Sequence, residues 1–341
     1  MNSRILFILI VVFIINSFLL GQENKPKVTL YGDFKGYYQT DMTKNTEEFT
    51  LNAARIGAKG SLNEFISYKV LVNFAQLGSL STKKDSDGKV TDVKAKFGEV
   101  LQDALFKLNL DKSFYITMGQ FKVPISTDNL RTPLEIYFVN RPLLTKVTPE
   151  LRDVGASATF INNEMIPIEI NAGLFNGSGA NKTETDRTLN YAFRGLFKPI
   201  EQVSLSGNYY SGKLTNTDVN IFDFGTTVKV NNLQVDAEYA YRDADSTNFT
   251  RKSFSFYGYA LYTFKMDTKL ISGIQPSIRY EYFEPDNNIA DDEQNRFTVG
   301  LSLILIENSL NQIKFNYEIL DYKNINKDTV KKFYIAFQTA F

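Results

Sequence analysis

Hydrophobic and polar residues alternate with a period of two along most of the chain beyond residue 26. In the stretch NRFTVGLSLILI (295–306), Phe297 and Leu301 share one parity, whereas Thr298 and Ser302 share the other. Alternation of this kind is typical of a β-strand with one apolar and one polar face. A soluble β-sandwich and a membrane barrel would both show it, so a single strand does not distinguish them.

The alternating pattern recurs often enough to predict sixteen antiparallel strands. The predicted strands span residues 27–40, 48–60, 64–76, 99–110, 114–122, 153–162, 166–175, 188–198, 202–212, 218–230, 233–242, 253–265, 270–283, 295–306, 312–322 and 330–341. Their connections tend to alternate between short turns, such as 61–63 and 199–201, and long loops, such as 77–99 and 123–152. This combination is typical of an outer-membrane barrel. We therefore predict an all-β, sixteen-stranded transmembrane β-barrel.

The first 21 residues form the most apolar segment of the chain. Arg4 precedes the apolar run 5–20, and the small residue Gly21 follows it, which is the pattern of a signal peptide. We expect a signal peptide at residues 1–21 and the barrel at residues 22–341. A retained membrane anchor is the alternative, because the run approaches spanning length. No later apolar run approaches the length that a membrane-spanning helix needs. A closed barrel is therefore the remaining way for the rest of the chain to cross a membrane.

Composition narrows the possible functions. The 38 Lys and Arg residues balance the 38 Asp and Glu residues, so no charge excess would attract nucleic acid. The chain contains no His and no Cys, which removes the commonest general base and metal ligands. We expect no enzyme, no cofactor and no metal site. The acidic segment DNNIADDEQN (286–295) lacks the central Gly of an EF-hand and is interpreted as a solvated loop tip.

The long connection 123–152 is the third external loop of the predicted barrel. It contains apolar residues, including Ile136, Phe138 and Leu144, that would be unfavourable in a solvated loop. A barrel of sixteen strands is too wide for its own side chains to fill, so its lumen is expected to hold water. We predict that this loop folds into the lumen as a constriction.

Basic residues outnumber acidic residues at the polar parity of the predicted strands, which would concentrate anions in a confined channel. The pore-lining and constriction candidates are Lys35, Lys69, Lys107, Lys122, Arg131, Arg141, Arg152, Arg194, Arg279 and Lys314. Arg131 and Arg141 are expected to affect selectivity most, because a constriction brings its charges closest to a passing ion. The alternative is that charges of both signs only solvate the wall, with loop acids such as Asp128 and Glu135 pairing with loop cations.

The second predicted strand requires an irregular register. Phe49 and Ala53 occupy the apolar parity, but Arg55 and Lys59 follow at the same parity. A β-bulge near residues 53–55 would turn the two cations toward the lumen.

Four segments carry a resemblance to a known family. They are FTLNAARIGAKGSL (49–62), GQFKVPIS (119–126), IYFVNRPLL (136–144) and LRDVGASATF (151–160). On these segments the chain resembles the phosphate-selective porin O and P family of bacterial outer membranes. The resemblance implies a sixteen-stranded, trimeric porin with a constriction loop, although the second strand has less Arg than that family usually carries. The terminal Phe341 is similar to the assembly signal of outer-membrane proteins.

These features together predict an outer-membrane porin for passive diffusion of small hydrophilic solutes, favouring anions such as phosphate. Its expected partners are small anionic solutes, outer-membrane lipid, the barrel-assembly machinery and two further copies in a homotrimer. The alternative function is a structural or adhesive barrel, or a surface antigen, whose pore is incidental or closed.

Overall fold

The computed structural model describes residues 27–76, 80–84, 90–95, 100–164, 166–183, 188–214, 216–247, 249–305, 310–324 and 326–341. The predicted signal peptide, residues 1–21, lies outside the described residues and stays a prediction. None of the helices in the described ranges is long and apolar enough to cross a membrane.

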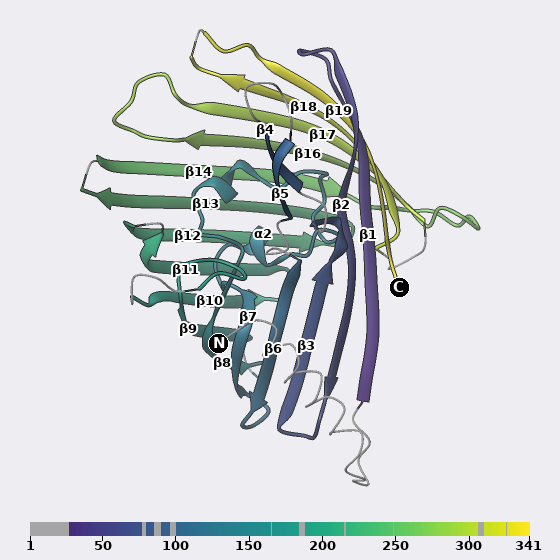
Figure 1. Ribbon diagram of the computed structural model, residues 1–341. Helices are drawn as coiled ribbons and strands as arrows, with labels where there is room; N and C mark the ends of the chain where they lie inside the picture. The colour runs from purple at the N-terminus through teal and green to yellow at the C-terminus, as the bar shows by residue number, and fades with distance from the viewer. Residues whose placement is uncertain are drawn as a thin grey trace.

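Sixteen long antiparallel strands form one closed barrel, as the alternating pattern predicted (Figure 1). They are β1 (Lys27–Asp41), β2 (Thr46–Ser61), β3 (Ile66–Asn73), β6 (Leu101–Asn109), β7 (Phe114–Lys122), β8 (Arg152–Asn162), β9 (Ile168–Phe175), β10 (Asn190–Ile200), β11 (Val203–Leu214), β12 (Thr217–Val230), β13 (Leu233–Ser246), β14 (Phe249–Tyr262), β16 (Gly273–Glu284), β17 (Gln294–Ile304), β18 (Gln312–Tyr322) and β19 (Val330–Ala340). The barrel closes where β1 pairs with β19, from Asp33 opposite Ala340 to Asp41 opposite Lys332.

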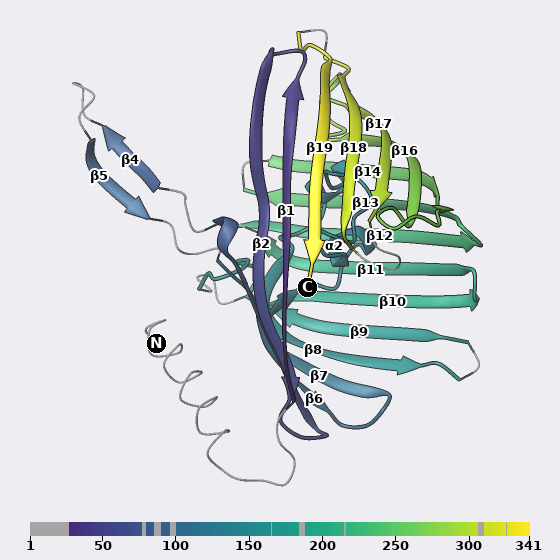
Figure 2. The same ribbon diagram turned by 90° about the vertical axis from the view of Figure 1, so that its right-hand side faces the viewer.

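The remaining elements are short. The two-residue strand β15 (Phe264–Lys265) extends the pairing of β14 with β16. Strands β4 (Leu80–Lys84) and β5 (Val90–Ala95) form a separate hairpin within the connection 77–99 that the sequence pattern predicted as a loop (Figure 2). The helical elements are η1 (Phe74–Gln76), α2 (Thr127–Leu130) and η2 (Leu143–Lys146).

The two faces of each strand meet different surroundings. In β17, Phe297 and Leu301 are exposed on the outer surface, whereas Thr298 and Ser302 are buried toward the lumen, as predicted. In β19, Tyr334 and Ala336 are buried while Phe337 is exposed. Large apolar side chains that are exposed on a closed barrel are suited to lipid contact.

The predicted bulge in the second strand is present, one step earlier than expected. The pairing of β1 with β2 shifts between Lys35, opposite Ala53, and Gly36, opposite Leu51, so Asn52 is the extra residue. Ala53 therefore faces inward and is 1% exposed, which corrects its assignment to the apolar outer parity. The shift turns Arg55 toward the lumen, where it forms a two-pronged ion pair with Asp33 at 2.6 and 2.7 Å.

The carboxyl end of the chain lies in the wall of the barrel. The backbone N–H of Phe341 donates to Gly32 O at 3.0 Å, and the N–H of Gly32 donates to Phe341 O at 3.0 Å. The side chain of Phe341 is 79% exposed. A role for this residue in assembly stays a prediction.

Candidate functional site

The long connection 123–152, the predicted third external loop, folds inside the barrel, as its apolar composition predicted. Figures 1 and 2 both place α2, which belongs to this connection, within the ring of strands. The loop buries the apolar side chains Val123, Ile125, Leu134, Ile136, Phe138, Val139, Leu143, Leu144 and Val147. Phe138, Leu143 and Leu144 pack in one cluster with Tyr257 and Tyr259 of the lumen wall. The lumen side of the wall is thus apolar at the place where the loop packs against it.

Two buried lysines of the wall hold the middle of the loop. Lys35 Nζ donates to Pro133 O at 3.2 Å and to Val139 O at 3.0 Å. Lys314 Nζ donates to Ile136 O. Lys35 is 0% exposed and Lys314 is 1% exposed. Both predicted pore-lining residues therefore bind backbone carbonyl groups of the loop, which would otherwise lose hydrogen bonds on burial.

The amino-terminal part of the loop is attached to β13 and β14. Arg131 Nη1 donates to the hydroxyl of Tyr259 at 2.7 Å, and its Nη2 forms an ion pair with Asp236. Glu238 accepts from the backbone N–H of Thr127 at 2.5 Å, at the start of α2. These contacts join residues about a hundred positions apart in the chain.

The carboxyl-terminal part of the loop is attached to β16, β17 and β18. Arg279 Nη1 donates to Asn140 O at 3.0 Å, and Arg296 Nη2 donates to Arg141 O. The N–H of Leu143 donates to Glu281 Oε1 at 2.8 Å. Within the loop, the Arg141 guanidinium pairs with Asp128 at 3.0 Å. This agrees with the alternative interpretation, in which acids of the loop pair with its cations. The loop is therefore fixed against the side of the lumen formed by β13–β19 and β1.

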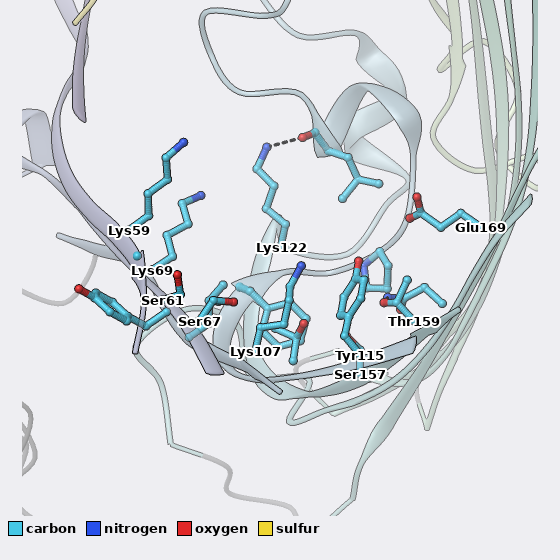
Figure 3. Close-up of a pocket in the computed structure, with 18 of the residues that line it drawn as sticks. Lys59, Ser61, Ser67, Lys69, Lys107, Tyr115, Lys122, Ser157, Thr159 and Glu169 are labelled. Atoms are coloured by element: carbon cyan, nitrogen blue, oxygen red, sulfur yellow. Dashed lines mark hydrogen bonds between the residues drawn. The ribbon is translucent and has the colours of Figure 1, made fainter. Parts of the chain in front are cut away.

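The opposite side of the lumen contains an open cavity of about 610 Å³. It lies among strands β1–β3 and β6–β10, near the short turns, and Figure 3 shows lysine side chains from several strands pointing into it. Its basic lining residues are Lys27, Lys59, Lys69, Lys107, Lys122 and Arg194, and Glu169 is its one acidic lining residue. Hydroxyl groups of Ser61, Ser67, Tyr115, Thr117, Ser157 and Thr159 add hydrogen-bonding capacity. Small anions would meet both positive charge and donors here.

Several cations of the cavity have no ion-pair partner among the described residues. Lys59 on β2 lies directly opposite Lys69 on β3, an arrangement that is unfavourable for like charges. Lys107 Nζ lies 3.7 Å from the centroid of the Tyr115 ring. Among the described residues, neither Lys59 nor Lys107 forms an ion pair within 4.0 Å, and the same is true of Arg194.

Lys122 joins the cavity to the loop. It lines the cavity, and its Nζ donates to Leu130 O at 2.8 Å and to Arg131 O at 2.6 Å, at the end of α2 (Figure 3). A cation is favourable at the carboxyl end of a helical turn, where the backbone carbonyl groups lack partners. Lys122 thus lines the cavity while fixing the loop beside it.

A second cavity of about 290 Å³ shares Arg194 with the first. Its other basic lining residues are Arg131, Lys198 and Lys229, and its acidic lining residue is Glu201. The positive character of the lumen therefore continues along β10–β12, toward the loop.

Asp103 is the main buried acid beside the larger cavity. Its Oδ1 accepts from Arg152 Nε at 2.7 Å, and its Oδ2 lies 2.7 Å from Lys69 Nζ. Arg152 is 8% exposed and lines neither cavity. Its positive charge is therefore neutralised by Asp103 and does not act on the cavities.

Replacing Asp103 with Asn should increase the preference of the channel for anions, because it releases the charge of Lys69 and Arg152. The reversal potential across a salt gradient in a planar bilayer measures this change. Glu64→Gln, which removes one negative charge from an exposed short turn, is the matched control. An equal shift for both variants would contradict a specific role for Asp103.

The sequence-derived candidates thus fall into two groups and one single residue, Arg152. Lys69, Lys107, Lys122 and Arg194 line the larger cavity, whereas Lys35, Arg131, Arg141, Arg279 and Lys314 make contacts of the loop, and Arg152 pairs with Asp103. The candidate set did not include two cavity lysines, Lys27 and Lys59. The bulge predicted in the second strand had already placed Lys59 on the lumen side.

Comparison with known proteins identifies the family. A profile described as phosphate-selective porin O and P matches residues 27–232, which is more than half of the chain. No curated protein sequence matches.

Solved structures share the fold at low sequence identity. An anion-selective porin from Comamonas acidovorans is 12% identical, with a TM-score of 0.65 over 93% of this chain and 100% of that one. The outer-membrane channel DcaP of Acinetobacter baumannii is 13% identical, with a TM-score of 0.65 over 94% and 99%. The trimer form of OmpT from Vibrio cholerae is 10% identical, with a TM-score of 0.62 over 93% and 99%.

The matched profile, the closed barrel and the inward loop agree on one assignment. The protein is an outer-membrane porin, a channel rather than an enzyme. The chain belongs to the phosphate-selective porin O and P family.

Proposed function

We propose that this porin passes small hydrophilic solutes by passive diffusion and prefers anions, phosphate among them. The observation that carries the proposal is the cavity of about 610 Å³, whose lining contains six basic side chains from separate strands and one acid, Glu169. Positive side chains in a confined, water-filled lumen with low-dielectric walls raise the local concentration of anions and lower that of cations.

The position of the loop supports the same proposal. The loop occupies the side of the lumen where the acids Asp236, Glu238 and Glu281 lie, and it pairs or hydrogen-bonds with each of them. Solute is therefore left with the side of the lumen that is rich in lysine. The arrangement lets the loop both narrow the channel and cover acidic groups that would attract cations.

Two of the structures with a similar fold are consistent with this proposal. One is an anion-selective porin and another is a trimeric outer-membrane protein. We propose the same preference and a homotrimer for this chain, with outer-membrane lipid and the barrel-assembly machinery as its other partners and residues 1–21 as its signal peptide.

The proposed preference is tested by the reversal potential of purified protein in a planar bilayer under a potassium chloride gradient. We expect the sign of the reversal potential to show that chloride permeates more readily than potassium. This preference should decrease as the salt concentration rises, because the Debye length falls from about 10 Å at 0.1 M to about 3 Å at 1 M. A preference for potassium would contradict the anion proposal. Absence of open conductance steps would instead favour a structural or adhesive barrel.

A further inference from the structure

A cluster of carboxylates lies at the opposite end of the barrel from the lysine cavity. Glu284 ends β16, and Asp292 and Glu293 immediately precede β17, so all three lie at the base of one outer hairpin. One carboxylate oxygen from each of the three residues lies within 4.8 Å of the other two. This segment was interpreted from the sequence as a solvated loop tip.

The three carboxylates are not solvated in the way that interpretation requires. Glu284 is 6% exposed. Glu284 Oε1, Asp292 Oδ1 and Glu293 Oε2 are each buried and have no hydrogen-bond partner. Carboxylates grouped this closely, with buried oxygens that lack a hydrogen-bond donor, are unfavourable when ionised unless a cation neutralises them or one of them takes up a proton.

Two protein cations lie near the hairpin, and one of them reaches the cluster at Glu293. Lys323 Nζ contacts the other oxygen of Glu293, Oε1, at 2.7 Å and lies 3.4 Å from Asp291. Arg251 lies 3.6 Å from Asp286. Neither Glu284 nor Asp292 forms an ion pair among the described residues within 4.0 Å.

We propose that Glu284, Asp292 and Glu293 bind a calcium ion at the outer mouth of the barrel. The ligands are all carboxylate oxygens, which is the donor set that hard divalent cations prefer. The absence of His and Cys from the whole chain leaves no softer ligand that would favour a transition metal. Calcium completes its six to eight oxygen ligands readily with water, so three protein carboxylates at a partly exposed hairpin suit it better than magnesium.

Bound calcium would join the two strands of the hairpin at the place where their acids face each other. Phe283 pairs with Gln294, so Glu284 and Glu293 follow as the next positions across the ladder. Like charges at such positions destabilise a strand pair. A bound calcium ion would neutralise the repelling carboxylates by coordinating all of them, and would thereby hold the β16–β17 hairpin in one conformation.

Calcium binding is measured by isothermal titration calorimetry on the full-length protein in detergent. We expect one ion per chain, with a dissociation constant of about 0.1–1 mM, the range of extracellular calcium modules. Glu284→Gln and Asp292→Asn should each weaken binding at least about tenfold, because each removes a ligand from the cluster. Retained barrel folding is checked by heat-modifiable gel mobility.

Asp291→Asn is the matched control, because it removes the same charge from the neighbouring position without touching the cluster. It should leave affinity within about threefold of wild type, since Asp291 is exposed and its one ion pair among the described residues is with Lys323. No binding by the folded wild-type protein at 10-fold above the expected constant would overturn the proposal. So would an equal loss of affinity in Asp291→Asn, which would mean general attraction to an acidic loop.

Terbium provides an independent readout of position. The hydroxyl of Tyr282 donates to Glu284 Oε2 at 3.1 Å, and the chain has no Trp. Terbium in the cluster should therefore emit on tyrosine excitation, calcium should displace it, and Tyr282→Phe should lower the emission while calcium affinity is retained. Emission unchanged by Tyr282→Phe would place the ion elsewhere and contradict the proposal.

Discussion

Replacing Lys59 and Lys107 together with Glu is expected to turn the channel from a preference for anions to a preference for cations. Both side chains line the larger cavity, and neither is ion-paired in the described part of the chain. The exchange changes the charge of the confined cavity by four units while the wall and the loop contacts stay in place. The reversal potential in a potassium chloride gradient should change sign at about 0.1 M salt, where charges act over about 10 Å.

The matched control is the same exchange at Lys44 and Lys112, which lie exposed in connections between strands and line neither cavity. It changes the net charge of the protein equally but should shift the reversal potential only slightly. Equal shifts in the two double variants would show that overall charge, and not the cavity, determines selectivity.

Replacing Lys35 and Lys314 together with Met is expected to release the loop from the wall. Each substitution leaves buried loop carbonyls without their donor, which costs about 1–3 kcal/mol. Since 1.4 kcal/mol corresponds to a factor of about ten in population, the loop should leave its docked position for a substantial fraction of the time. Single-channel recordings should show larger and noisier conductance, and gel mobility should still show a folded barrel.

Lys252→Met with Lys331→Met is the control for this prediction. Lys331 is exposed and Lys252 is half-buried, and no hydrogen bond or ion pair joins either side chain to the loop in the described part of the chain. The control should retain the wild-type conductance. Wild-type conductance in the Lys35 and Lys314 variant would mean that these two lysines do not hold the loop.

Much of the fold could be predicted from the sequence because strand alternation is a local signal. The parity of Phe297 and Ser302 alone assigns the two faces of β17, and repetition of that pattern determines the number of strands. The apolar residues Ile136 and Phe138 similarly predicted that the third long loop folds inward. The hairpin of β4 and β5 was missed because it lies in a segment that was assigned as a polar loop.

The candidate site was harder to predict, because a lumen charge depends on partners far away in the chain. Arg131 pairs with Asp236, and Lys35 binds Val139 O, across separations of 105 and 104 residues. Periodicity shows that such side chains point inward, but not whether they meet solute or the loop. Exchange of Arg131 for Glu would therefore disturb the loop as well as the charge, and Lys59 and Lys107 are better probes of selectivity.

The most direct test of the account is to locate anions in the lumen by anomalous diffraction from crystals soaked in bromide. We expect bromide in the cavity of about 610 Å³, near Lys59, Lys69 and Lys107. The Lys59 and Lys107 to Glu variant should lose these peaks under the same soak. A cavity that holds no bromide in the wild type, but holds rubidium from a matched soak, would contradict the claim that this lumen selects anions.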